Sequence, residues 1–335
     1  MDPGIFNVPV FGLSGPGAHA LRGEKNGHAA RIDMIPTGLE KWEAAVGDYV
    51  SEEVLQTVVL ADPRFSACHR KYVEGALAYA GENAAFQTIA SDMGQYFLCS
   101  IAVYMDASGG LTHRRLRALM GDAGILSAGR ATALLWRLRL GKFIEPVDTD
   151  AGEGLLKQFV PTPAMVQAFR ERLRVDFGAL AILEPAVEPL LARFDEPDMY
   201  RLIIQLMGED LIGSAARPDS RLEEFHMIAA RAAGVLIMYD MAASVESADD
   251  FPASGPVTSS VAALARRFGV SRSHVLSLLR QMEKARFTTF DAATGRVMVQ
   301  PLMRETLRHF QGVVATGQLR VAHRVLAAIP ASPAA

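Results

Sequence analysis

The stretch VAALARRFGVSRSHVLSLLRQMEKARF, residues 261–287, decides the fold. It contains two sets of apolar residues at helical spacing: Val261, Leu264, Ala265 and Phe268, then Val275, Leu278, Leu279 and Met282. Between the two sets, Gly269 permits a tight turn and Ser271 can cap the helix that follows. The stretch therefore predicts two amphipathic helices joined by a short turn.

The second of these helices has a polar outer side. Short hydroxyls, histidine and arginine near the start of a helix suit the edges of bases in the major groove of DNA. Two short strands, 287–290 and 296–300, follow around a DAATG turn, and together the elements predict a winged helix-turn-helix. Arg296 lies beside Gly295 in this hairpin, where it suits a minor-groove contact. The candidate DNA-binding residues of this unit are Ser271, Arg272, Ser273, His274, Ser277, Arg280 and Arg296.

The same unit occurs once more, earlier in the chain. Residues 127–143, SAGRATALLWRLRLGKF, align with residues 271–287, so that Ser127 matches Ser271. Two short strands, 143–147 and 155–160, again bracket a Gly-bearing turn, DTDAGEG. We therefore expect a mainly α protein with two winged helix-turn-helix units, each with a short β-hairpin wing, arranged as a fused pseudo-dimer.

The first copy offers fewer groups to DNA than the second. Its candidate DNA-binding residues are Ser127, Arg130 and Arg137. The same helix also carries Ala128, Gly129 and Ala133, which specify little, and the hairpin tip carries Asp148, Asp150 and Glu153, which phosphate would repel. Trp136 is expected to pack at the wing or at an interface. The second copy is therefore predicted to lead in DNA binding.

The stretch LARRFGVSRSHVLSLLRQMEKARF, with its DAATGR hairpin and C-terminal helix, resembles the MarR family of bacterial regulators. The stretch LRALMGDAGILSAGRATALLWRLRLGKF is similar, and a PTPAM segment follows where the family opens its last helices. The resemblance covers residues 85–175 and 222–321. It implies winged units that bind DNA. Because family members are dimers of single-unit chains, two units in one chain imply that a single chain does the work of a dimer.

Positive charge is concentrated in the two predicted units. Residues 112–142 carry seven Lys and Arg against one Asp, and residues 258–286 carry six against one Glu. The net charges of the two stretches are +6 and +5, while the whole chain is −3, so the remaining residues carry −14. Basic units on an otherwise acidic protein are typical of proteins that bind nucleic acid.

Helical periodicity covers most of the remaining chain, at 39–50, 65–80, 85–105, 163–175, 199–211, 222–243 and 302–314. Residues 1–36 are rich in Gly and Pro and are expected to form an extended arm, and residues 326–335 a flexible tail. Between them, 37–178 and 179–325 are each expected to hold a helical segment and one winged unit. Half the residues are hydrophobic and 21% are charged, as in a globular protein.

Other classes of protein are disfavoured. Cys68 and Cys99 are far apart and lack zinc or disulfide spacing, and no P-loop, HExxH or GxSxG motif occurs, so we expect no metal, no cofactor and no catalytic residue. The N-terminus lacks the features of a signal peptide, and the apolar stretch 229–245 is interrupted by charges, so a cytoplasmic protein without a membrane partner is expected. Methionines on the long helices fit core packing better than an effector pocket: Met93, Met105, Met207, Met227, Met238 and Met241.

These features predict a sequence-specific DNA-binding transcriptional regulator whose partner is double-stranded DNA. Modulation by a small-molecule effector and association into a homodimer are left open. Two alternatives remain. A plasmid-type replication initiator also uses tandem winged helices and would bind repeated origin sequences, whereas a protein–protein adaptor would use such units without DNA.

Overall fold

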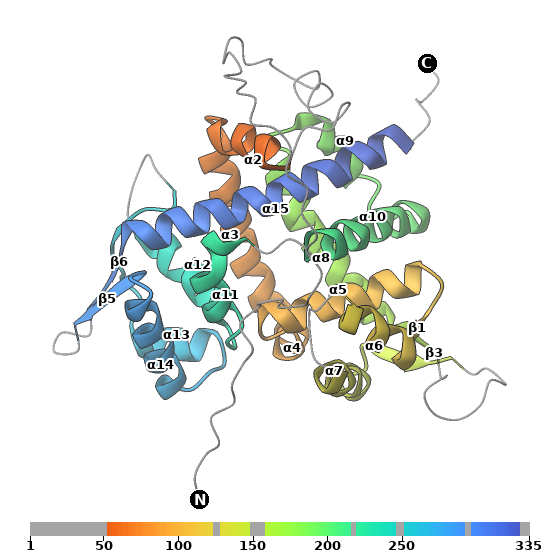
Figure 1. Cartoon of the computed structure of the whole chain (residues 1–335), viewed down its shortest axis with the longest axis horizontal. Helices are drawn as coiled ribbons and strands as arrows, with labels where there is room; N and C mark the ends of the chain where they lie inside the picture. The colour runs from red at the N-terminus through yellow and green to blue at the C-terminus, as the bar shows by residue number, and fades with distance from the viewer. Residues whose placement is uncertain are drawn as a thin grey trace, which may run out of the picture.

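The computed structural model describes residues 52–122, 128–147, 158–215, 219–245, 251–291 and 296–328 (Figure 1). Several predictions lie outside these ranges: the arm 1–36, the helix 39–50, the tips of both hairpins, most of the tail and the candidate residue Ser127. The described part is mainly helical, as predicted, with two small antiparallel sheets.

Helix α2 (Glu52–Ala61) precedes the first copy. Its elements are α3 (Phe65–Glu82), α4 (Ala84–Ile89), α5 (Met93–Ala107), β1 (Leu111–Thr112), α6 (His113–Asp122), α7 (Ala128–Leu140), β2 (Ile144–Pro146), β3 (Gln158–Pro161) and α8 (Pro163–Leu180). A short connection, η1 (Pro185–Val187) and α9 (Glu188–Leu191), leads to the second copy.

The second copy repeats this order of elements. They are α10 (Pro197–Ala215), η2 (Ser220–Leu222), α11 (Glu223–Ala229), α12 (Gly234–Ser244), β4 (Gly255–Pro256), α13 (Val261–Arg267), α14 (Arg272–Lys284), β5 (Thr288–Asp291), β6 (Arg296–Val299) and α15 (Pro301–Ala328). The strand order is β1-β3-β2 in the first sheet and β4-β6-β5 in the second. The internal repeat read from the sequence is thus also a repeat of topology.

The repeat extends to single backbone angles. Lys142 and Arg286, which the sequence alignment pairs, both adopt positive φ, at 59° and 60°. The next residue in each copy turns back onto the preceding helix with the same hydrogen bond: Phe143 N–H donates to the Leu138 carbonyl and Phe287 N–H to the Met282 carbonyl, both at 2.8 Å. The same turn therefore starts the first hairpin strand in both copies.

The two copies pack on one another reciprocally. Helix α5 of the first copy packs on α10 of the second, and the equivalent helix α12 of the second copy packs on α3 of the first. The final helices, α8 and α15, contact each other. Such exchange of equivalent contacts is the mark of a twofold interface, here between two halves of one chain. In Figure 1, α6–α7 and α13–α14 lie toward the same lower edge of the molecule, on either side of α4 and α11.

The predicted helices 85–105 and 222–243 are each wrong as single helices. The first is split into α4 and α5, because Asp92 caps α5 by accepting a hydrogen bond from Gln95 N–H at 2.9 Å. The second is split into α11 and α12, which are bent by 102° around Ala233 at φ 57°. The two breaks touch, since Ala233 N–H donates to the Ser91 carbonyl at 2.7 Å. Apolar periodicity runs across both breaks and so conceals them.

The ends of the hairpin strands lie within one residue of the predicted ones, apart from the predicted start at 155, which lies outside the described ranges. Strands β1 and β4 were not predicted. Each of these extra strands has two residues and pairs with the second strand of its hairpin, which is the central strand of the sheet. A two-residue strand is too short for an alternating pattern to reveal it.

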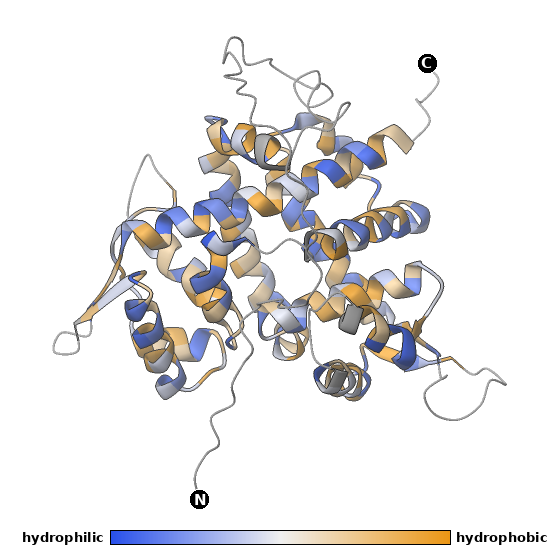
Figure 2. Ribbon diagram, in the orientation of Figure 1, coloured by the Kyte–Doolittle hydropathy of each residue, from blue (hydrophilic) through white to orange (hydrophobic). Residues whose placement is uncertain are grey.

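Hydrophobic residues gather on the inner sides of the helices, and α6 is mostly hydrophilic (Figure 2). Among the described helices, none taken alone is both long and apolar enough to cross a membrane. The bent pair formed by η2–α11 and α12 passes that test of length and composition when its two halves are counted together.

Gly234 is expected to be essential to the bend between α11 and α12. A Cβ at this position would lie 2.1 Å from the carbonyl oxygen of Ile228, which belongs to rigid backbone. Gly234→Ala should therefore lower the free energy of unfolding by about 1–3 kcal/mol or more, as overpacked sites do. Gly178→Ala in α8 is the matched control, because a Cβ there meets nothing within 4 Å. It should be neutral or stabilise by up to about 1 kcal/mol. Urea denaturation would compare the two, and equal effects would contradict the clash.

Candidate nucleic-acid interface

Helix α14 begins and packs as the sequence predicts. Ser271 caps it, its Oγ accepting a hydrogen bond from His274 N–H at 3.1 Å. Gly269 adopts φ 63° in the turn before it. Its inner face is fully buried and consists of Val275, Leu278, Leu279 and Met282. Capping and burial together fix which side of α14 faces outward.

The outward side of α14 is basic and hydroxyl-bearing. Arg272, Ser273, Ser277, Arg280 and Lys284 are all exposed. At 100° per residue, Ser273, Arg280 and Lys284 lie opposite the buried face, with Arg272 at the start of the same helix. Ser271 and Ser273 place their hydroxyl oxygens 2.9 Å apart. This side therefore presents hydrogen-bond donors along about three helical turns.

A third side of α14 rests on the turn between α11 and α12. His274 Nε2 donates to the Ala232 carbonyl oxygen at 2.9 Å. Arg231 donates to Gln281 Oε1 at 3.2 Å and to Ser277 Oγ at 3.4 Å. His274, predicted on the open side, is thus half-buried and bonded within the chain, because its position on the helix faces this turn. The contacts fix the rotation of α14 relative to the scaffold.

The neighbouring helix α13 is also anchored to the scaffold. The Asp240 carboxylate of α12 is 3% exposed and forms an ion pair with Arg267. Ser259 Oγ donates to the same carboxylate at 2.9 Å. Because the carboxylate is buried and paired, the α13–α14 pair is held to α12 by a polar contact as well as by packing.

The second hairpin carries the predicted residue Arg296 in the open. Arg296 begins β6 opposite Asp291 and is exposed, whereas Val297 and Val299 of the same strand are buried. The sheet thus directs alternate side chains inward and leaves Arg296 on the outer surface. Residues 292–295 of this hairpin lie outside the described ranges.

The first copy has the same buried face on α7 and a different outer side. Its inner residues are Ala131, Leu134, Leu135 and Leu138. Arg130 is exposed, whereas Arg137 reaches back to the scaffold and donates to Gln95 Oε1 and to the Thr88 carbonyl oxygen, both at 2.7 Å. Arg137, a predicted DNA-binding residue, is therefore engaged within its own copy, on the side that Gln281 occupies in the second copy.

Trp136 is predicted to pack at the wing or at an interface; within the chain it is mostly exposed, so its place at an interface stays a prediction. Its side chain is 56% exposed, and Leu140, one turn later, is 79% exposed. The Arg139 guanidinium lies 5.4 Å from the Trp136 ring centroid. The aligned positions in α14 are Arg280 and Lys284, which lie opposite the buried face, and Trp136 is exposed for the same reason.

Sequence reasoning missed Arg231 and Lys284. Lys284 continues the spacing of Ser273 and Arg280, so its helical position was a usable signal. The role of Arg231 had no such signal, because it depends on a bend that brings residue 231 to residues 277 and 281.

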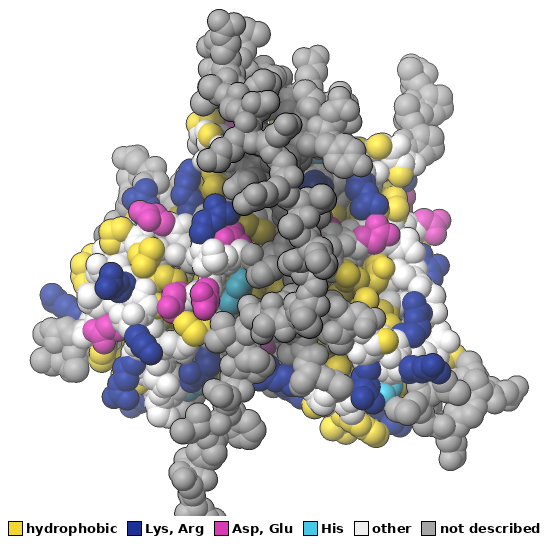
Figure 3. Space-filling model, viewed as in Figure 1, with side chains coloured by type: hydrophobic (Ala, Val, Ile, Leu, Met, Phe, Trp, Pro, Cys, Tyr) yellow, Lys and Arg dark blue, Asp and Glu magenta, His cyan; other side chains and the backbone are white. Residues whose placement is uncertain are grey.

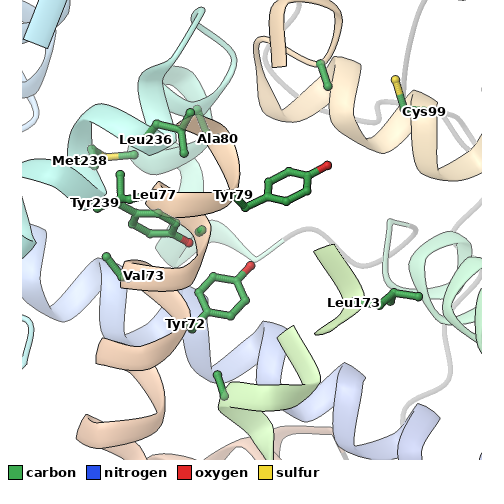
Figure 4. Close-up of a cluster of buried hydrophobic side chains, with 14 of the residues drawn as sticks. Tyr72, Val73, Leu77, Tyr79, Ala80, Cys99, Leu173, Leu236, Met238 and Tyr239 are labelled. Carbon is green, nitrogen blue, oxygen red and sulfur yellow. The ribbon is translucent and has the colours of Figure 1, made fainter. Parts of the chain in front are cut away.

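A buried ion pair lies near the contact between the copies. Arg172 and Asp176 of α8 form an ion pair at 2.9 Å, and Arg172 also donates to the Tyr72 hydroxyl oxygen. The Arg172 guanidinium lies 4.9 Å from the Tyr72 ring centroid and 5.9 Å from those of Tyr79 and Tyr96. Burial raises the pKa of Asp176, against the attraction of Arg172. Figure 4 shows Tyr72 on α3 next to Tyr239 on α12. We interpret this cluster as structural, since its charges are paired with one another.

The remaining candidates for chemistry are in the core. Met105, Met238 and Met241 are buried there, as are Cys68 and Cys99, and burial raises the pKa of the Cys68 thiol to about 12. His69 is fully buried, and burial lowers its pKa to about 3. In the described part of the chain, no three His, Cys, Asp or Glu side chains are grouped to hold a metal ion.

Comparison with known protein families, with curated proteins and with solved structures gives no match.

Proposed function

We propose that this protein is a DNA-binding transcriptional regulator in which α14 of the second copy enters the major groove. The observation that carries the proposal is the outward side of α14, where Arg272, Ser273, Arg280 and Lys284 are exposed on a capped, fixed helix. Arginine can form two hydrogen bonds with guanine, and a serine hydroxyl can donate a hydrogen bond to a base edge or accept one from it. These groups therefore suit sequence-specific contacts with bases.

The order of elements supports a winged helix-turn-helix interpretation of each copy. In the second copy, a helix, a short strand, two helices joined by a Gly turn and a hairpin follow in that order, and the short strand pairs with the second hairpin strand. In this interpretation β5–β6 is the wing, and the exposed Arg296 contacts the backbone or a minor groove beside α14.

The contacts with the scaffold support a recognition helix, α14, that is oriented before DNA binds. His274 and Gln281 bond the α11–α12 turn, and Arg267 bonds the buried Asp240. A helix that is already oriented loses less freedom on binding, so more of the contact energy remains as affinity. In this proposal His274 and Gln281 therefore position α14 and do not contact bases.

A salt series tests the proposal. The exposed cations of the second unit include Arg266, Arg272, Arg280, Lys284 and Arg296, which suit contact with about four phosphates. Affinity for a duplex selected from a random 30-base-pair pool should then fall about 100-fold between 50 and 200 mM salt, because each phosphate contact releases counterions. Mobility shifts would measure it. A fall of about 10³–10⁵-fold would mean that both units contact phosphates. No binding to any duplex at low salt would overturn the DNA-binding proposal.

A further inference from the structure

The two copies differ most on the outward side of their equivalent helices. Where α14 has Arg280 and Lys284, α7 has Trp136 and Leu140. The buried residues correspond position by position, so both helices present these two residues to the outside. The difference therefore concerns what each helix presents and not how it packs.

Trp136 and Leu140 form the most exposed apolar pair in the part of the chain that the structure describes. Their exposures of 56% and 79% exceed those of the other exposed large hydrophobic residues there, which are Met227, Met298 and Leu302 at 38–43%. At i and i+4 on one helix the two side chains are neighbours on one face. An exposed aromatic beside an exposed leucine is a feature of protein-binding surfaces, where aromatic residues are enriched.

The surroundings of this pair are basic. Exposed cations on α6, on α7 and just after it include Arg114, Arg117, Arg139 and Lys142. Arg139 lies directly over the Trp136 ring. In Figure 3, hydrophobic side chains at the lower edge of the molecule near α7 have Lys and Arg side chains beside them. The surface thus combines an apolar centre with a cationic rim.

We propose that α7 of the first copy docks a partner protein through an acidic amphipathic helix. The apolar side of such a helix would cover Trp136 and Leu140, and its carboxylates would meet the cations around them. Contact with the same face of a second copy is disfavoured, because it would place like charges together. DNA is disfavoured at this helix, because Trp136 and Leu140 offer base edges at most an apolar contact with the thymine methyl.

The proposal makes the chain a bridge, with DNA on the second copy and a protein on the first. The reciprocal packing of the copies joins the two units that carry α7 and α14. A partner protein bound to α7 would therefore lie beside the DNA that α14 contacts.

A designed peptide tests the surface in the full-length chain. The probe is a labelled 18-residue helix with leucine at i, i+3, i+4 and i+7 spacing and glutamate on the rim, and its control is a scrambled peptide of the same composition. We expect the helical peptide to bind at least tenfold more tightly than the scrambled one by fluorescence anisotropy. Trp136 itself reports burial in a Trp42→Phe background, because the chain has only two tryptophans. Its emission should shift to the blue on binding.

Matched variants separate the two copies. Trp136→Arg with Leu140→Lys gives α7 the residues of α14 and should lower peptide affinity at least tenfold. Arg280→Ala should leave peptide affinity unchanged and lower DNA affinity. All substituted side chains are exposed, so folding should be preserved, as circular dichroism would verify.

Three outcomes would overturn the proposal. The first is peptide affinity that the Trp136/Leu140 variant does not change. The second is Trp136→Ala weakening DNA binding as much as Arg280→Ala does, which would assign α7 to DNA. The third is a dimer, found by light scattering, that the Trp136/Leu140 variant dissociates. That result would assign the face to a second copy of the chain.

Discussion

Replacing Arg172 by methionine should lower the free energy of unfolding by about 3–5 kcal/mol. The Arg172 and Asp176 side chains are only 12% and 5% exposed, and Arg172 also bonds the Tyr72 hydroxyl. Methionine fills a similar volume but leaves the Asp176 carboxylate buried without its counter-charge. Removing one member of a buried ion pair costs more than the pair itself contributes, because the remaining charge has lost its access to water.

Two controls make this prediction specific. Arg172→Met combined with Asp176→Leu removes both charges and should recover most of the lost stability. Arg193→Met breaks the exposed pair with Glu196, whose members are 40% and 51% exposed, and should have little effect on stability because solvent screens the pair. Urea denaturation measures all three variants. If the single Arg172 variant is as stable as the Arg193 variant, the charges of the cluster are not desolvated as the structure indicates.

The same cluster connects the two copies into one folding unit. Arg172 comes from α8 and Tyr72 from α3 of the first copy, and Tyr72 packs edge-on against Tyr239 of α12, with ring centroids 6.2 Å apart. Because side chains of both copies share this core, we expect one cooperative unfolding transition in the scaffold, with neither copy stable alone.

A structural feature could be predicted from the sequence where the residues that determine it are close together in the chain. The α13–α14 pair could be predicted because Gly269, the cap Ser271 and the apolar spacing all lie within one short stretch, and the repeat doubled the signal. The break between α11 and α12 could not, since Ala233 is held at φ 57° in the contact with Ser91 of the other copy. The break between α4 and α5 had a local signal, the cap formed by Asp92 and Gln95, which the apolar periodicity concealed. Arg172 meets Tyr72 across 100 residues of sequence, a pairing that no local pattern reveals.

The candidate site divides in the same way. The exposure of Arg272 and Arg280 follows from helical position alone, and the structure places both outside. The engagement of His274 and Arg137 depends on turns elsewhere in the chain, so the sequence assigned both to DNA while the structure bonds them to the scaffold. The exposure of Trp136 likewise follows from its helical position, and its predicted place at an interface stays a prediction.

Replacing Arg272 and Arg280 together by alanine should lower affinity for the selected duplex by about 2–6 kcal/mol. Each arginine that contacts a base or a desolvated phosphate contributes about 1–3 kcal/mol. The two positions are eight residues apart on α14, about 12 Å along the axis, so their effects should be nearly additive. Neither residue belongs to the buried face, and thermal unfolding should be unchanged.

Lysine variants distinguish reading of bases from attraction to phosphate. Arg272→Lys with Arg280→Lys keeps both charges but loses the planar fork that pairs with guanine. Affinity for random duplex should then stay within about threefold of the unchanged chain, while preference for the selected sequence should fall by about 10-fold or more. The first-copy change Arg130→Ala should have the smaller effect, because the outward side of α7 carries Trp136 and Leu140. If lysine preserves the sequence preference, these arginines contact only phosphate, and another element must read the bases. If Arg130→Ala is the more damaging change, the assignment of DNA reading to α14 is wrong.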